Sequence, residues 1–547
     1  MSWFICVLSK KPLLDWEVVI FHQTHPQTEY VVENKNFYLA FAAQKGQFTY
    51  RKSDEEESGY YLQLGHGYIA KNTGYCPADL LDWKKLLTQE YAPKDIDGHY
   101  VVLKIKPDYV QITNDPLGHY PLYYIKQDDY FVASNCLNYL APLVSNRTLK
   151  YSSFASLALC PFPLVKESLL NKVQLAQSGS TITYHTDRIT KSTSKINFLA
   201  DNSLGGEDYL FYLRKVFDLQ LPHLVCMVFP WENSFTSRYA FSVFKDQNPQ
   251  HWGLAIQQNS TFLPNKFLLS EEALKYQYFL FSPSLNPETI WQNYQSFVLT
   301  TGLSDFPVFF DWASSFSSPT GKKIIFHFSK ASEWLFAKKP LSKTDFLFNL
   351  LKKNSFSAFK SQYVTQNHFF NQEFYSFLLT DLKKMLSRAI QELATTGTVY
   401  DQYLFYIENL HLPTFAPSLV WLNNFHHFYS PGLLYSFVCR HVLQRLTNPH
   451  FYQKKQDNIP FFNPNLKKYP QVRKEKWTLL NMPHRNEEFF PLIEHKVGEM
   501  LAQANSVAYY DFKALVKLFG RAKKKNTQAI SLILKWTACE IWRKAIE

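Results

Sequence analysis

Histidines and cysteines are among the side chains of this sequence that could bind a metal ion or attack a substrate. His411, His426 and His427 lie close enough together to suggest a metal site, but the adjacent pair would face apart on a helix. The seven cysteines stand singly, and no CxxC pair occurs, so neither a zinc site nor a disulfide framework is indicated. We predict no metal centre and expect most cysteines to behave as small core residues.

Other catalytic signatures are missing. No GxSxG, HExxH, P-loop or GxGxxG motif occurs in the chain. Ser2 follows the initiator methionine, which is normally removed before serine, and it would then present a hydroxyl beside a free α-amine. A hydroxyl is a much poorer nucleophile than a thiolate at neutral pH. We therefore interpret Ser2 as an ordinary first residue.

The charge of the chain admits an acidic partner without specifying one. The 547 residues are 46% apolar and 19% charged, which excludes a disordered chain, and they carry a formal net charge of +12. The densest basic cluster, Arg521–Lys525, is interpreted as a solvated helix end. Nucleic acid is a disfavoured partner because no zinc-finger spacing, RNA-binding signature or helix-turn-helix accompanies the charge. No apolar run reaches the length of a membrane span and no signal peptide is recognised, so we expect a cytoplasmic protein with no membrane partner.

The elements that must position any site change character along the chain. Alternating apolar residues predict one pair of strands at 101–105 and 109–113 and a second pair at 121–125 and 130–134. A further hairpin is predicted to end at 179–184. Beyond about residue 206 helical periodicity dominates, interrupted by short apolar strands, and this succession predicts a parallel sheet with helical covers. Those strands lie at 224–229 and 323–328, and beyond about 345 the pattern is almost wholly helical.

Four segments in the first 190 residues follow one another in a familiar order. Asp97–Val102, Asn114–Tyr124 and Phe131–Ser134 match the patterns dGxFaf, rDplGxrPLYY and faSe, and Val173–Ser180 is similar to a later v..l.PGs segment. Their order and spacing resemble the N-terminal domain of the asparagine-synthetase-like family, which includes β-lactam synthetases and lasso-peptide macrolactam synthetases. Fainter similarity continues to about residue 445. Within it, Asn424–Leu433 takes the place of a helix start that reads E.R.PfLD in the family.

The resemblance implies an α+β domain followed by an α/β domain. The first would be an Ntn-hydrolase-like, β-rich sandwich of the class II glutamine amidotransferase type. The second would be a PP-loop domain, an adenine-nucleotide α-hydrolase-like parallel sheet, with a helical C-terminal part. The expected boundaries are 1–190 for the amidotransferase-like domain, 191–205 for a linker, 206–445 for the synthetase-like domain and 446–547 for a helical C-terminal extension.

The family's chemistry is eroded in the first domain. The resemblance implies a glutaminase whose nucleophile is the cysteine exposed by methionine removal, and here that position is Ser2. The family's glutamine-holding NGEIYN stretch has no clear counterpart. We therefore expect no working glutaminase.

The implied ATP loop is eroded as well. A SGGxDS loop should follow the strand at 224–229, because its glycines let backbone N–H groups reach pyrophosphate and its aspartate holds Mg²⁺. The sequence there is Pro230-Trp231-Glu232-Asn233-Ser234-Phe235. The Trp231 indole would fill the phosphate space, and Ser234 stands in place of the aspartate. The carboxylate of Glu232 would face phosphate without a metal, and two like charges about 4 Å apart cost about 1 to 4 kcal/mol.

A second acidic loop has changed in parallel. The family's Asp-Glu pair falls on Glu333 and Trp334, or on Ser332 and Glu333 if the register slips by one. Only one carboxylate survives in either register. Two phosphate and metal elements are therefore lost together, and no cofactor is expected.

Three hypotheses remain open. The first is a non-catalytic pseudoenzyme that binds a peptide or small-molecule substrate, or a catalytic partner protein, in an amide-forming pathway such as the modification of a peptide natural product. The second is a divergent ATP- and Mg²⁺-dependent amide ligase or macrolactam cyclase with a rebuilt site. The third is a basic protein that binds nucleic acid. The first is preferred because both phosphate elements are lost while fold residues such as Gly98, Asp115, Gly118 and Pro121 are kept.

Overall fold

The computed structural model describes residues 3–193 apart from short gaps, 286–304, most of 368–394, 486–546 and a few single residues nearby. Between residues 226 and 429 it also describes the backbone of five strands. The statements below concern these residues.

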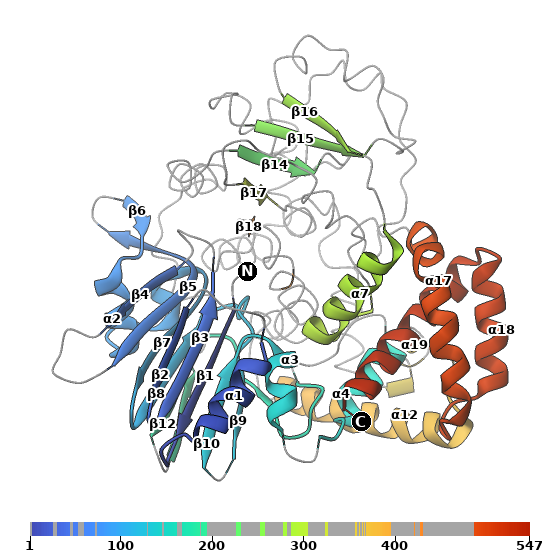
Figure 1. Cartoon of the computed structure of the whole chain (residues 1–547), viewed down its shortest axis with the longest axis horizontal. Coiled ribbons are helices and arrows are strands. Elements are labelled where there is room, and N and C mark those ends of the chain that lie inside the picture. Colours follow the sequence, from blue (N-terminus) through green and yellow to red (C-terminus); the bar gives the residue numbers. More distant parts are fainter. Residues whose placement is uncertain are drawn as a thin grey trace.

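Two antiparallel sheets form the N-terminal domain (Figure 1). The first has the order β11-β9-β10-β1-β3-β2 and the second has the order β13-β12-β8-β7-β5-β4, with β6 paired to β5. The strands of the first sheet are β1 Trp3–Ser9, β2 Tyr30–Asn34, β3 Phe37–Ala42, β9 Tyr123–Lys126, β10 Tyr130–Ser134 and β11 Gln174–Leu175. Those of the second are β4 Phe48–Lys52, β5 Tyr60–Lys71, β6 Gly74–Pro77, β7 Asp97–Lys106, β8 Tyr109–Asn114, β12 Ser180–His185 and β13 Arg188–Thr193. The predicted β-rich sandwich is confirmed.

Side-chain alternation explains how the sheets stack. In β1, Phe4, Cys6 and Leu8 point into a core shared with residues of the second sheet such as Leu103. The intervening residues, such as Ile5, belong to a different core on the outer face. Because β1 has a buried residue at every position, it is covered on both sides. The resulting layers are helix, sheet, sheet and helix.

The outer layers are helices that the sequence pattern did not predict. α1 (Asp15–Gln23), α3 (Leu137–Leu140) and α4 (Tyr151–Leu159) lie against the first sheet, and α2 (Leu80–Leu87) lies against the second. α4 escaped prediction because every residue from Ser152 to Leu159 is buried, so these residues present no solvent-exposed face that would give an amphipathic period.

A five-stranded parallel sheet follows, as predicted. Its strands are β14 Cys226–Pro230, β15 Trp252–Gln257, β16 Gln277–Phe281, β17 Lys323–Phe326 and β18 His427–Tyr429. Their order in the sheet is β16-β15-β14-β17-β18, with every pairing parallel. The order reverses between β14 and β17, which makes their carboxyl ends the topological switch point of this sheet.

The helices of the C-terminal half pack against the N-terminal domain. They are α7 Pro287–Thr301, α12 Gln372–Ala394, α17 Asn486–Gln503, α18 Phe512–Lys523 and α19 Thr527–Ile546. The centre of this group is α19, whose Trp542 donates its indole N–H to the Val298 carbonyl at 2.9 Å, while Tyr294 donates its hydroxyl to the Leu534 carbonyl at 3.0 Å. One hydrophobic core joins these helices to α4 and the outer face of the first sheet. None of the helices in the described part is both long and apolar enough to cross a bilayer.

Candidate functional site

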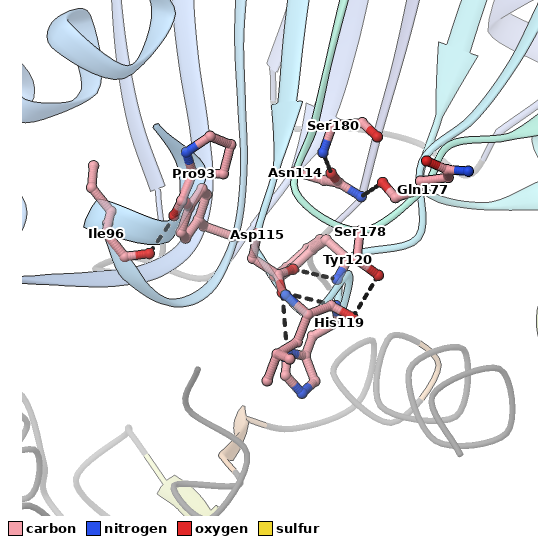
Figure 2. A network of polar contacts seen from close by, with 11 residues as sticks. Pro93, Ile96, Asn114, Asp115, His119, Tyr120, Gln177, Ser178 and Ser180 are labelled. Atoms are coloured by element: carbon pink, nitrogen blue, oxygen red, sulfur yellow. Dashed lines mark hydrogen bonds and ion pairs between the residues drawn. The ribbon is translucent and has the colours of Figure 1, made fainter. Parts of the chain in front are cut away.

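A buried aspartate organises the loop that joins β8 to β9 (Figure 2). The carboxylate of Asp115 accepts hydrogen bonds from the backbone N–H groups of Leu117 (3.1 Å), His119 (3.0 Å) and Tyr120 (2.9 Å). Its own carbonyl accepts from the N–H of Gly118 at 2.9 Å, and Gly118 has φ of 68°, a conformation that favours glycine. The carboxylate therefore holds the turn in shape while its charge is shared among several donors.

The ring of His119 completes this loop. Its Nδ1 lies 3.1 Å from Asp115 Oδ1, and both side chains have no exposed surface. An aspartate that holds one ring nitrogen of a histidine is the arrangement that orients a general base. The Nε2 atom is buried and has no hydrogen-bond partner among the described residues.

A second histidine stacks on the first. His99, in β7, lies with its ring centroid 4.0 Å from that of His119 and at an interplanar angle of 23°. Burial lowers the pKa of His99 well below its ordinary value, and the neighbouring His119 and His66 rings lower it further. The ring of His99 is therefore neutral at neutral pH. Among the described residues no group of three or more His, Cys, Asp or Glu side chains could hold a metal ion.

The same loop bonds to the segment before β12. The side chain of Asn114 accepts from the N–H of Ser180 at 2.8 Å and donates to the Gln177 carbonyl at 3.2 Å. The hydroxyl of Ser178 donates to the Leu117 carbonyl at 3.0 Å. Two of the four family-like segments are thus one structural unit, which gives a physical reason for their co-occurrence.

Gly98 is also required by packing. It has φ of 138°, and an added Cβ would lie 2.1 Å from the carbonyl oxygen of His66 on the neighbouring strand. Only glycine fits there without displacing backbone. The residues that carry the resemblance therefore maintain the fold. Sequence reasoning treated the His99 and His119 positions as part of these motifs and missed that their rings stack; no sequence signal reports that contact.

The start of β1 is closed by side chains. Trp3 has no exposed surface, and its ring lies 5.0 Å from the rings of both His25 and Tyr139. The N–H of Phe4 donates to Asn135 Oδ1 at 3.0 Å. This region resembles a packed core more than a substrate pocket, and Ser2 itself lies outside the described residues.

Four buried cysteines of the described part, Cys6, Cys136, Cys160 and Cys539, are unsuited to nucleophilic chemistry. Burial raises the pKa of Cys6 to about 12, and it raises that of Cys160 to about 12 against the lowering effect of the Lys535 charge. Burial likewise raises the pKa of Cys136 and Cys539 far above the ordinary thiol range. These four thiols are protonated at neutral pH, as the core-residue prediction implied.

The predicted nucleotide loop begins at the switch point of the parallel sheet. Pro230 is the last residue of β14, and β17 beside it ends at Phe326. The remaining predicted positions lie outside the described residues: Trp231, Glu232, Ser234, Phe235, Ser332, Glu333 and Trp334. His411 and His426 lie outside them too, and of His427 the backbone alone is described, at the start of β18.

Comparison with known proteins finds only distant similarity. No family model matches the chain, and the comparison with curated proteins found no match. Among solved structures, the allosteric regulatory enzyme of purine biosynthesis is 10% identical with a TM-score of 0.21; the match covers 47% of this chain and 66% of that one, just under two thirds. Glutamine phosphoribosylpyrophosphate amidotransferase from B. subtilis, complexed with ADP and GMP, is 9% identical with a TM-score of 0.24, over 59% of this chain and 81% of that one. At these TM-scores neither protein's activity is transferred to this chain.

Proposed function

We propose that this protein is a non-catalytic, partner- or substrate-binding component of an amide-forming pathway. It would keep an asparagine-synthetase-like architecture, with an Ntn-hydrolase-like N-terminal domain and a PP-loop-like second domain, and it would have eroded glutaminase and ATP sites. The layered N-terminal domain, the parallel sheet and the fold-maintaining role of Gly98 and Asp115 support the architecture.

The observation that carries a binding role is the apolar outer face of α1. Trp16, Val19 and Ile20 lie on one face at helical spacing and are 59%, 52% and 40% exposed. Leu14 precedes the helix and is 54% exposed. Exposed apolar clusters of this kind mark protein–protein contacts in folded domains.

The neighbouring strand extends the same surface. His22 of α1 is 2.7 Å from Glu33 of β2, which places the helix beside that strand. β2 is the edge of its sheet among the described strands, and its Val31 is 38% exposed. An edge strand beside an apolar helix face suits a protein partner that contributes a strand or a helix. The occupant we propose is therefore a catalytic partner protein.

The closed start of β1 and the protonated thiols support the absence of glutaminase activity. Hydrolysis of glutamine by a thiol enzyme needs a thiolate that substrate can reach. The four buried cysteines of the described part are protonated at neutral pH, and the first described residue, Trp3, is enclosed by rings.

The eroded phosphate loops support the absence of adenylation. Trp231, Phe235 and Trp334 would stand at the carboxyl edge of the parallel sheet, where ligands bind in open α/β folds. There we propose that aromatic side chains form a contact surface in place of an ATP site. Replacing Trp231 and Trp334 with alanine should weaken capture of substrate or partner by more than about 1 kcal/mol each. A fall in melting temperature with unchanged capture would instead mean that they fill the core.

The experiment that tests the proposal measures adenylation, glutamine hydrolysis and partner binding. Purified protein with Mg²⁺ should catalyse neither ATP–pyrophosphate exchange nor glutamine hydrolysis, and Ser2→Ala should change neither result. In parallel, the products of adjacent genes are tested for binding. A Trp16→Ala, Val19→Ala variant should weaken that binding, whereas Val516→Ala, an exposed apolar residue on α18, should not. Exchange activity, or binding that is insensitive to the α1 change, would refute the corresponding half of the proposal.

A second candidate is a divergent ATP-dependent amide ligase. It is favoured by one observation, the position of Pro230 at the switch point of a parallel sheet. Titration with ATP and Mg²⁺ separates the two candidates. A non-catalytic component should bind no tighter than millimolar, whereas a micromolar dissociation constant, about −8 kcal/mol, would favour the ligase.

A further inference from the structure

A row of cations covers the outer face of α18. Lys513, Lys517 and Arg521 recur every fourth residue and are all exposed. Lys524 and Lys525 continue the row past the end of the helix and are exposed too. Four helical residues rise about 6 Å, so these side chains stand in line along one face. We call these five residues the α18 row.

The row is not neutralised within the described part of the chain. From Phe512 to Lys525 the sequence has six cations and no carboxylate. One of the six, Lys523, pairs with Glu494 of α17 at 3.1 Å. Another carboxylate of α17, Glu499, pairs with Lys496 of the same helix at 3.8 Å. Lys496 also pairs with Glu288 of α7 at 3.1 Å. For the α18 row itself, the described residues provide no ion pair.

The opposite face of α18 fixes the orientation of the row. Leu515, Leu518 and Ala522 are buried against the hydrophobic core that includes α19. The helix therefore cannot roll to bury its cations, and Figure 1 shows α18 as an outer helix of the C-terminal group. The charge of Arg521 also acts on His368, because burial lowers the pKa of His368 and this guanidinium lowers it further.

We propose that the α18 row binds the phosphodiester backbone of nucleic acid without reading base sequence. From Lys513 to Lys524 the row is about 16 Å long, a length over which duplex DNA presents about ten phosphate charges. Evenly spaced cations on a rigid helix can neutralise several of these at once, and the net charge of +12 favours the encounter at longer range. This inference concerns a surface other than the α1 face and does not depend on the proposed function.

The surroundings of the row favour nucleic acid over an anionic membrane or an acidic peptide. A membrane-bound helix inserts its apolar face, but the apolar face of α18 is committed to the core. Val516 is the one large apolar side chain of the described residues of α18 that is more than a third exposed. Protein partners are usually anchored by buried aromatic and apolar side chains, and the described residues of α18 offer no aromatic side chain that is more than a third exposed. Gly520 keeps part of the outer face open, since a Cβ added there would touch nothing within 4 Å.

The test uses the full-length protein and a fluorescein-labelled DNA duplex, with anisotropy measured over a range of salt concentrations. We expect binding whose logarithm falls linearly with the logarithm of salt. The variant Lys513→Gln, Lys517→Gln, Arg521→Gln should weaken binding about tenfold or more and reduce the salt slope by about three. The control Lys383→Gln, Lys384→Gln, Arg388→Gln removes the same charge from exposed positions of α12 and should leave both quantities nearly unchanged.

Three outcomes would overturn the inference. One is no binding at low salt by the unmodified protein. Another is an equal loss in the α18 and α12 variants, which would mean that net charge alone attracts the duplex. The third is binding to phosphatidylserine vesicles with none to the duplex, which would assign the row to a membrane. Far-UV circular dichroism of both variants confirms that each is folded before the comparison is made.

Discussion

The ammonium group of Lys535 in α19 lies 2.7 Å from the carbonyl oxygen of Cys160, which directly follows α4, 375 residues earlier in the chain. Both residues are buried. The bond satisfies a carbonyl at the end of a buried helix, and it ties the C-terminal helices to the N-terminal domain. The two ends of this protein therefore share one core and are expected to unfold together.

Replacing Lys535 with methionine tests this link. Methionine keeps most of the side-chain volume and removes the donor, so the Cys160 carbonyl is left buried and unpaired. We expect a loss of about 1 to 3 kcal/mol in the free energy of unfolding, measured in urea. The control Lys524→Met makes the same change at an exposed position, and it should alter the free energy of unfolding by less than about 0.5 kcal/mol. Equal stabilities for both variants would show that the bond contributes nothing.

Asp115→Asn should destabilise the N-terminal domain. The amide has one accepting oxygen in place of two, and its NH₂ group faces backbone donors that the carboxylate now satisfies. We expect a loss on the order of 2 to 3 kcal/mol, seen as a lower urea midpoint. Asp108→Asn serves as the matched control, because that carboxylate is exposed and pairs only across the surface with His185. If the two variants melt alike, Asp115 does not organise the loop.

Replacing two glycines, Gly98 and Gly520, with alanine should change the stability of the protein in opposite directions. Gly98→Ala forces a residue with a side chain into φ of 138° and against the His66 carbonyl. The backbone strain alone should lower the free energy of unfolding by about 1 to 3 kcal/mol, and the clash with the carbonyl should add to this loss. Gly520→Ala lies in a helix with open space around it and should stabilise the protein by about 0.5 to 1 kcal/mol. Thermal melts of both variants give the comparison. A neutral Gly98→Ala would contradict the close approach of β7 and β5.

The stacked histidines predict a loss of stability in mild acid. Burial lowers the pKa of His99 well below its ordinary value of 6.5. As the pH falls below that value, His99 is protonated in the unfolded chain but stays neutral in the folded chain. The free energy of unfolding should therefore be unaffected by His99 above about pH 6.5. Below that pH it should fall, with His99 contributing up to about 1.4 kcal/mol per pH unit.

The matching experiment compares the pH dependence of unfolding in three proteins. His99→Phe keeps an aromatic ring in the stack and removes the titrating group, so its stability should fall less steeply between about pH 6.5 and 5. His495→Gln removes a histidine whose side chain is 85% exposed, and it should follow the unmodified protein. A His99→Phe curve parallel to the unmodified one would show that another group controls the acid response.

Local patterns were sufficient to predict several strands and the parallel arrangement of the second sheet, although β15, β16 and β18 of that sheet were not predicted. Residues 101–105 and 109–113 alternate around a turn, and they form β7 and β8 in register. The short apolar runs at 224–229 and 323–328 became β14 and β17, paired in parallel. The α18 row is also visible in the sequence, because Lys513, Lys517 and Arg521 recur with a period of four just before the cluster at 521–525.

The sequence by itself determined the hairpin strands at 101–105 and 109–113 and the apolar strands at 224–229 and 323–328, because these depend on residues close together in the chain. Only the tertiary structure decided the rest. α4 is a helix with no amphipathic signature because it is covered on every side, and the covering includes α19 from the far end of the chain. His99 and His119 stack because β7 and the β8–β9 loop fold onto each other. Contacts between distant segments leave no periodic trace in either segment, so composition and spacing could not report them.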